Sequence, residues 1–542
     1  MSGPVPGPVV ADNRHPRGAP GPAGDPDEWE WAATPAADLR ENTELVIPSR
    51  SDGIVRSATK LVGGPLGRHG VVGRARLTPL RVILALALVG LALGWSTKAG
   101  CLQQHSGSDG LSLDWDHHRQ YIAMCYTDTV PLYSAERLDR GAFPYKLSWT
   151  ESKAGGGEQQ RFMEYPVITG LYMYGAMRVA KAWTWMHDNW GVPAALEVVL
   201  FFTVVAFGLA LFWLVTVWAT AILGGRRIWS TWLVALSPLV FVHIFTNFDA
   251  IATACLAVAL LFWSRRNLWA AGVFIGLGTA AKLYPALALL VLLVLCLRTG
   301  KVREFAVTAV CAVATWLVVN VPILALYPRG WWEFFRLNSD RNPDVTSLYR
   351  VVTEVSGYDW GAGGGSTPTL VNAISLALFV LVCLFVAFLG LRAPTRPRVA
   401  QLLFLLVAGF LLVNKVWSPQ YSLWLVPLAV LAIPHARILL TWMTVDALTW
   451  IPLMGIFLPA DARWLPPGWF FTFLVVRAVL VLGLCALVVF EIYRPEYDLV
   501  RNPEPGVRIA DPIGGVLNDS QGETVRLRAG SWQRADTARA SG

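Results

Sequence analysis

Charge is scarce in this sequence: Asp, Glu, Lys and Arg make up only 15% of its 542 residues, while apolar residues make up 54%. An ordinary soluble domain carries about 25% charged residues. The low charge and high apolar content of this chain therefore exclude water as the main solvent of the fold. Basic residues exceed acidic ones by eight. They lie in short clusters between apolar runs and form no continuous face, which argues against a nucleic-acid partner.

Cysteine is also sparse, and most of it is buried in apolar sequence. Five of the seven cysteines lie inside apolar runs, which leaves Cys101 and Cys125 as the pair that shares one polar loop. If that loop lies outside the cell, the oxidising compartment permits a disulfide between them. The sequence does not supply the geometry that such a bond requires, so the pairing stays open.

Long apolar runs, in contrast, recur along the whole chain. Several approach or exceed the roughly 20 residues that a helix needs to cross the hydrocarbon core. They show no alternation with a period of two, so they favour helices over a closed barrel. We therefore expect an all-α membrane protein with about 12 transmembrane helices. The clearest runs are 82–93, 198–223, 250–263, 305–326, 370–391 and 470–490.

The placement of residues 166–186 decides which side of the membrane each loop occupies. This segment is apolar but carries Arg178 and Lys181. If it does not cross, all the short basic connections fall on the side of the basic segment 60–81, as the positive-inside rule requires. We therefore predict an interfacial or re-entrant helix here. The connections concerned contain Arg226, Arg265, Arg298, Arg392 and Arg437.

The same reasoning predicts the organisation of the chain. Residues 1–75, rich in Pro, Gly and Ala, are expected to be a disordered cytoplasmic region, because they cannot bury enough apolar surface to offset the entropy of ordering. The transmembrane domain is expected over 76–492, with long outer loops at 100–194 and 327–368. The polar residues 493–542 are expected to be a cytoplasmic tail, mostly disordered. No small-residue cleavage site follows the first apolar run, so it is expected to stay as an anchor.

Short polar motifs are concentrated on the predicted outer side. They are Asp128 ahead of Tyr133, Gly141-Ala-Phe-Pro-Tyr145, Glu164-Tyr165-Pro166, Asn247-Phe-Asp249, Gly272 to Pro285 with its ending Ala-Ala-Lys-Leu-Tyr-Pro, and Ser418-Pro-Gln-Tyr421. Their order and common side resemble the GT-C class of membrane glycosyltransferases, and they are most similar to glycosyltransferase family 87, the polyprenyl-phosphate-mannose-dependent mannosyltransferases. The resemblance covers about residues 80–490.

The resemblance implies a GT-C-like bundle and identifies Asp128 as the matching catalytic base or acceptor ligand. A phosphate leaving group is already stable as an anion, so one carboxylate that accepts the proton of the attacking hydroxyl is enough. Cationic or amide groups would stabilise the departing phosphate. We expect no cofactor and no metal. The predicted substrate-binding residues are Tyr133, Tyr145, Glu164, Tyr165, Asp249, Lys282, Arg336, Arg341, Lys415, Gln420 and Tyr421.

Each of these residues also has a purely structural interpretation. Asp128 could cap a helix or pair with Arg137 or Arg140. Asp249 could be the N-cap of the helix that follows it. The Lys282 side chain could reach from an apolar helix to the membrane surface, and Arg336 and Arg341 could contact lipid headgroups. Asp446 and Glu197 lack an obvious partner in the sequence, and either could pair with Arg477.

Other acids in the first loop are weaker candidates. Asp109, Asp114 and Asp116 lack the distance to Gly141 that Asp128 has. The run from Asp114 to His118 contains metal-ligand residue types, but such a crowd in a loop is usually solvated polarity.

The leading hypothesis is an inverting glycosyltransferase in the plasma membrane, with both termini cytoplasmic and its active site extracytoplasmic. It would move a sugar, mannose by resemblance, from a polyprenyl phosphate to a cell-envelope lipid or polysaccharide. Its partners would be that donor, that acceptor and membrane lipids. The alternative is a transporter or flippase of a lipid-linked glycan, but no internal repeat is evident. A non-catalytic scaffold would leave Asp128 and Lys282 unexplained.

Overall fold

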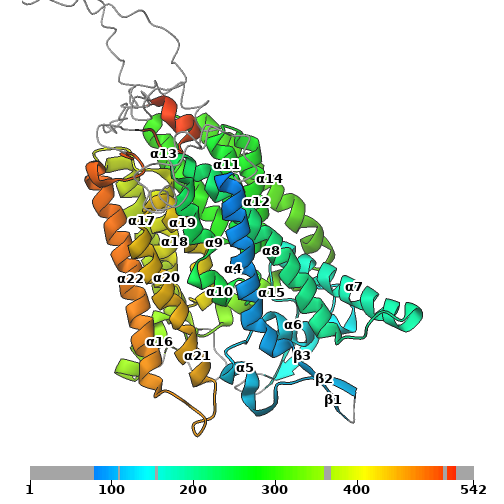
Figure 1. Ribbon diagram of the computed structural model, residues 1–542. Helices are drawn as coiled ribbons and strands as arrows, with labels where there is room; N and C mark the ends of the chain where they lie inside the picture. Colours follow the sequence, from blue (N-terminus) through cyan, green and yellow to red (C-terminus); the bar gives the residue numbers. More distant parts are fainter. Residues whose placement is uncertain are drawn as a thin grey trace, which may run out of the picture.

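The computed structural model describes residues 78–107, 110–152, 157–358, 360, 368–503 and 509–520. The region 1–75 lies outside the described residues. The described residues form a long bundle of helices (Figure 1), which confirms the all-α membrane class. Strands occur there only as two antiparallel hairpins, β1 (Gln104–Gly107) with β2 (Gly110–Leu113) and β3 (Trp149–Ser152) with β4 (Glu158–Arg161).

Six helical stretches within the described ranges are long and apolar enough to cross a membrane. They are built from α4 (Pro79–Ala99), α8 (Glu197–Gly224), α14 (Val302–Leu326), α17 (Thr369–Arg392), α20 with α21 (Ala436–Leu448, Trp450–Ile456) and α22 (Pro467–Tyr493). Shorter apolar helices lie between them: α11 (Asp249–Ser264), α12 (Leu268–Ala281), α13 (Leu287–Thr299), α18 (Val399–Val413) and α19 (Ser422–Ala432). Two further short helices, α9 (Trp232–Ala235) at the end of the stretch that begins with α8, and α10 (Pro238–His243), follow in the chain. The structure thus supports six membrane-spanning stretches within the described residues, and the predicted total of about 12 crossings, each needing about 20 residues, stays a prediction.

The first helix shows how local sequence sets a boundary. The Thr78 side chain accepts a hydrogen bond from the backbone N–H of Arg81 at 3.3 Å, and Pro79 occupies the first helical position. A hydroxyl cap satisfies a free N–H, and proline has none to satisfy there. The helix therefore starts at the edge of the apolar run.

Helix α7 (Val167–Trp190) lies differently from the rest. In Figure 1 it runs across the bundle and its end protrudes at the lower right. It is not among the stretches found apolar enough to cross a membrane within the described residues. This arrangement agrees with the interfacial placement predicted for 166–186.

Two glycines one turn apart bring α12 and α14 into direct backbone contact. A Cβ on Gly272 would lie 2.3 Å from the carbonyl oxygen of Thr308, and one on Gly276 would lie 2.4 Å from that of Ala312. Small residues at this spacing let membrane helices approach closely. The contact fixes α12, and so it fixes Lys282 at the carboxyl-terminal end of that helix.

The irregular elements gather at one end of the bundle, the lower end in Figure 1. They are α5 (Arg119–Ile122), α6 (Thr129–Ala135), α15 (Pro328–Asp340), α16 (Leu348–Ser356) and the two hairpins. Cys101 and Cys125, the pair that the sequence left open, form a disulfide within the first loop. This end, called the outer end below, therefore contains the two long polar loops.

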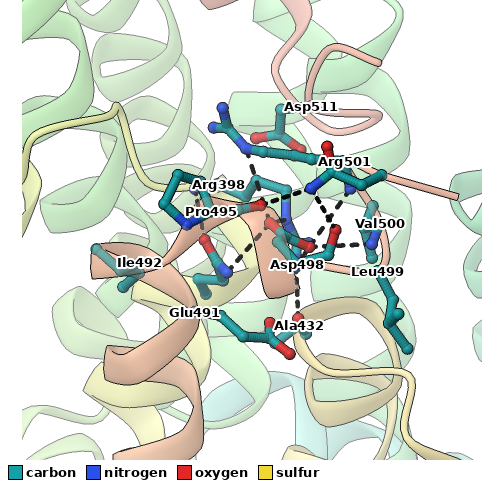
Figure 2. A network of polar contacts seen from close by, with 12 residues as sticks. Arg398, Ala432, Glu491, Ile492, Pro495, Asp498, Leu499, Val500, Arg501 and Asp511 are labelled. Carbon is teal, nitrogen blue, oxygen red and sulfur yellow. Dashed lines mark hydrogen bonds and ion pairs between the residues drawn. The ribbon is translucent and has the colours of Figure 1, made fainter. Parts of the chain in front are cut away.

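The opposite end is closed by part of the carboxyl-terminal segment. Asp498 bonds to Arg398, which also donates to the carbonyl oxygens of Leu431 and Ala432 at the end of α19 (Figure 2). Asp511 accepts a hydrogen bond from the backbone of Val399 at 2.8 Å. We call residues 494–503 and 509–519, together with Arg398, the inner clamp. These residues are packed against the bundle, because their acidic side chains bond to its buried groups. The prediction of a mostly disordered tail stays untested, since residues 504–508 and 521–542 lie outside the described residues.

Candidate active site

A cavity of about 340 Å³ lies at the outer end of the bundle. Its walls come from the first loop, the start of α7, the turn before α11, the end of α12, α15 and the segment 418–421. Seven of the residues predicted from the sequence line it: Asp128, Glu164, Tyr165, Lys282, Arg341, Gln420 and Tyr421. Segments that are far apart in the sequence therefore meet around one cavity. This agrees with the prediction that their motifs lie on the same side of the membrane.

Asp128 is held at this cavity by hydrogen bonds to uncharged groups. The amide of Asn247 donates to its Oδ2 at 2.8 Å and the amide of Gln420 donates to the same oxygen at 3.3 Å. Its backbone N–H donates to the carbonyl oxygen of Thr246 at 2.9 Å. Among the described residues it has no ion pair, so the predicted alternative of pairing with Arg137 or Arg140 is not observed. Asp128 holds the N-cap position of α6, but its side chain makes no capping bond.

The surroundings of Asp128 change its acidity. Burial raises the pKa of this carboxyl above its ordinary value, although hydrogen bonds from Asn247 and Tyr126 lower it; the nearby charge of Asp249 raises it further, and that of Lys282 lowers it. Desolvation disfavours the charged form of a carboxyl. Asp128 is consequently a stronger base than an exposed aspartate.

Lys282 presents a cation to the same cavity. Its Nζ lies 2.6 Å from Oδ1 of Asp249, and it lies over the ring of Tyr421, 4.5 Å from the centroid. Burial lowers the pKa of Lys282, but the neighbouring Asp249 and Tyr421 raise it, and the net direction is upward. A lysine in this position stays protonated. The cavity is thus lined by the Asp128 carboxylate, which has no ion-pair partner among the described residues, and by the Lys282 ammonium, which is paired with Asp249.

Asn247 is the site residue that sequence reasoning did not single out. Its amide reaches both Asp128 and the Tyr165 hydroxyl oxygen, the latter at 3.1 Å, and it joins the first loop to the turn before α11. It stands first in the motif Asn247-Phe-Asp249, and this motif was the available signal.

Glu164 and Arg341 complete the polar wall of the cavity. Burial raises the pKa of Glu164, while the charges of Arg341 and Arg161 lower it. The Arg341 side chain is 45% exposed and lies 3.9 Å from Asp344. Arg341 is therefore the more accessible cation of the wall.

Three predicted residues support the wall without lining it. The Asp249 carboxylate lies behind Lys282. Lys415 donates to the carbonyl oxygens of Ser339 and Arg341 at 3.2 and 2.7 Å, and burial together with the Arg341 charge lowers the pKa of Lys415 to about 8. Tyr145 donates to the carbonyl oxygen of Tyr165 at 3.0 Å. These contacts hold cavity residues in place.

The structure does not bring Tyr133 and Arg336 to the cavity. The Tyr133 hydroxyl donates to Glu197 at 2.6 Å. Arg336 bonds to Glu333 at 2.6 Å and to Asp340 at 3.1 Å. Both side chains are engaged in the loop structure around the cavity.

The remaining charged candidates of the sequence also have partners. Asp446 pairs with Arg477 at 2.7 Å, one of the two pairings that the sequence allowed, and Glu197 pairs with Lys181 at 3.1 Å. Asp114 forms an ion pair with Arg119, and Asp109 lies outside the described residues. Across the described part of the chain, no three His, Cys, Asp or Glu side chains gather as metal ligands.

Comparison with protein families adds to this geometry. Residues 181–414 match the sequence model of glycosyltransferase family 87. The chain resembles family 87. The predicted resemblance is confirmed over this segment, and the match supports glycosyl transfer as the class of reaction. The family 87 segment contains Asn247, Asp249 and Lys282, and it leaves Asp128 and Gln420 outside. No curated protein sequence matches the chain significantly.

Proposed function

We propose that the protein transfers mannose from a polyprenyl-phosphate donor to a cell-envelope lipid or polysaccharide, with inversion at the sugar carbon. The observation that carries this proposal is the shared cavity, in which Asp128 and Lys282 face the same space from different segments. A glycosyl transfer from a lipid phosphate needs one base and one cation. The cavity supplies both.

The chemistry assigns one role to each group. An acceptor hydroxyl oxygen attacks the anomeric carbon of the sugar, and the bond from that carbon to the phosphate oxygen breaks. The hydroxyl proton passes to Asp128, and the phosphate leaves as an anion beside Lys282 and Arg341. Proton transfer to a positioned base contributes about 100- to 10,000-fold in rate. Fixed charge near the leaving oxygen lowers the barrier further because it needs no reorganisation.

Two observations support an extracytoplasmic position for this cavity in the plasma membrane. The Cys101–Cys125 disulfide lies in the same loop as Asp128, and disulfides persist in oxidising compartments. The basic connections lie at the opposite end, as the positive-inside rule expects of a cytoplasmic side. A membrane-impermeant maleimide should label an Asp116→Cys variant in intact cells and leave an Arg437→Cys variant unlabelled. The reverse pattern would place the cavity in the cytoplasm.

The decisive experiment for the activity is a transfer assay with purified protein in lipid nanodiscs. Polyprenyl-phosphate mannose labelled in the sugar is supplied with a cell-envelope lipid extract, and a pentose donor is tested in parallel. We expect the label in a new glycoside with the mannose donor. Transfer only from the pentose donor would change the sugar assigned. Movement of intact donor across sealed vesicles with no new glycoside would instead show a flippase.

A further inference from the structure

The Lys282 ammonium is supported by more groups than a single surface ion pair provides. Beside the 2.6 Å contact to Asp249, it lies over two aromatic rings, Tyr421 at 4.5 Å and Trp424 at 5.5 Å from the centroids. Trp424 is itself stacked between Tyr421 and Tyr284, at centroid distances of 4.3 and 4.2 Å. An ammonium over such rings is attracted to their electron-rich faces. The Lys282 ammonium is thus held by an ion pair with Asp249 and by the aromatic rings of Tyr421 and Trp424.

Asp249 is the unusual member of this group. Its side chain is 1% exposed and it does not line the cavity. One oxygen, Oδ1, receives both the Lys282 ammonium and the indole N–H of Trp424, the latter at 2.7 Å. The other oxygen, Oδ2, is buried without a hydrogen-bond partner. A buried carboxylate is costly unless it is paired, and Lys282 is the charged partner of Asp249.

A helix-capping role does not explain Asp249. Helix α11 begins at Asp249 itself, the N-cap position belongs to Phe248, and no side chain makes a capping bond there. The structural alternative raised by the sequence is therefore absent. Its side chain is directed to Lys282 and Trp424 instead.

We propose that Asp249 and Trp424 are positioning residues: they keep Lys282 charged and directed at the cavity, where it receives the phosphate of the donor. This inference rests on the proposed function. Neither residue lines the cavity. The ionisable groups that face Lys282 are Asp249 from α11, Tyr421 from the segment before α19 and Asp128 from the first loop. Asp249 is the one among them in direct ion-pair contact.

The test is the pH dependence of the donor KM in an Asp249→Asn variant. The amide keeps the shape and the oxygen that accepts from Trp424, but it removes the charge. Lys282 should then lose its proton at a lower pH. Because each unit by which the pKa falls below the assay pH costs a tenfold loss of the charged form, we expect the donor KM to rise about tenfold more between pH 7 and pH 9 than in the wild type. The acceptor KM should stay unchanged.

Four further variants keep this test decisive. Asp498→Asn removes a buried acidic partner from the inner clamp, so it reports a general loss of stability and should leave the pH profile of the donor KM as in the wild type. Lys282→Gln has no ammonium to titrate, so its donor KM should lack the added pH dependence. The double variant of Lys282→Gln with Asp249→Asn should show the same pH profile as Lys282→Gln alone. If Asp249→Asn does not fold, Trp424→Phe keeps the stacked ring and removes the N–H. It should shift the profile in the same direction by a smaller amount.

The outcomes separate this inference from the proposed function. A wild-type pH profile in Asp249→Asn, or in Trp424→Phe where that variant is used, overturns the positioning role even if the wild-type protein transfers mannose. Absence of transfer by the wild-type protein overturns the proposed function itself. A matched shift in Asp498→Asn would show that the effect of Asp249→Asn is one of stability, and it would overturn the positioning role as well.

Discussion

Two aspartates, one at each end of the bundle, have opposite kinds of partners. At the inner clamp, Arg398 and Asp498 are 1% and 2% exposed and bond to each other (Figure 2), and the void beside Arg398 has a volume of about 20 Å³. At the outer end, the Asp128 carboxylate has only uncharged hydrogen-bond partners among the described residues and faces a cavity of about 340 Å³. A satisfied network stabilises one arrangement, whereas an incompletely satisfied one leaves bonding capacity for a ligand. The comparison assigns a stabilising role to Asp498 and a chemical role to Asp128.

The largest expected effect is on chemistry at the outer end. In Asp128→Asn the amide cannot accept the hydroxyl proton, so turnover should fall about 100- to 10,000-fold, the usual contribution of a general base. The thermal unfolding midpoint should not fall, because no ion pair of Asp128 is lost. The matched control is Asp116→Asn, which changes an exposed aspartate of the same loop. Equal turnover in the two variants would remove Asp128 from its role.

The inner clamp should show the opposite pattern. Asp498→Ala leaves the buried Arg398 guanidinium without its carboxylate, and breaking one side of a buried pair costs about 3–5 kcal/mol of unfolding free energy. We expect a lower unfolding midpoint with the donor KM of the remaining folded protein unchanged. Arg494→Ala breaks a pair in which both side chains are more than half exposed, so its cost should stay within about 1 kcal/mol. Loss of substrate affinity in Asp498→Ala would contradict the division between the two ends.

The contact between α12 and α14 tests whether the outer site depends on helix packing. A Cβ in Gly276→Ala would meet backbone, which cannot move aside cheaply, and overpacking costs about 1–3 kcal/mol. The displaced α12 carries Lys282, so the donor KM should also rise. Gly483→Ala, where a Cβ meets nothing within 4 Å, is the control, and both measurements should be unaffected or slightly improved there. An unchanged donor KM in Gly276→Ala would separate packing from the site.

The smallest expected effect is a displacement of the acidic limb of activity. Asp128 acts as a base only when ionised, so activity should rise with pH through its pKa, and burial places this limb above that of an ordinary aspartate. The Asn247 amide lowers that pKa, so Asn247→Leu should move the limb to higher pH. Asn189→Ala, on an exposed position of α7, should leave it in place. A limb that moves to lower pH in Asn247→Leu would contradict the assigned hydrogen bond.

The difference between the two ends also marks what could be predicted from the sequence. Apolar runs, basic connections and ordered motifs were enough to predict a helical membrane bundle and seven residues of the cavity wall. Each of these features depends on residues that are close together in the sequence. Asp128 was found because a carboxylate in an outer loop stands at a recognisable distance from Gly141.

Pairings between distant segments could not be read in the same way. The bond from Asn247 to Asp128, the hold of Asp249 on Lys282 and the clamp between Asp498 and Arg398 join residues 119, 33 and 100 positions apart. No periodicity or local motif records such a partner. The polar composition of 493–542 suggested disorder for the same reason, since the groups that satisfy Asp498 and Asp511 lie elsewhere in the chain.

The anomeric configuration of the product tests the central claim most directly. Direct displacement with Asp128 as the single base inverts the sugar carbon, so nuclear magnetic resonance of the purified glycoside should show the configuration opposite to that of the donor. Retention of the donor configuration would require a covalent intermediate on a second group, and it would contradict direct displacement with Asp128 as the only base.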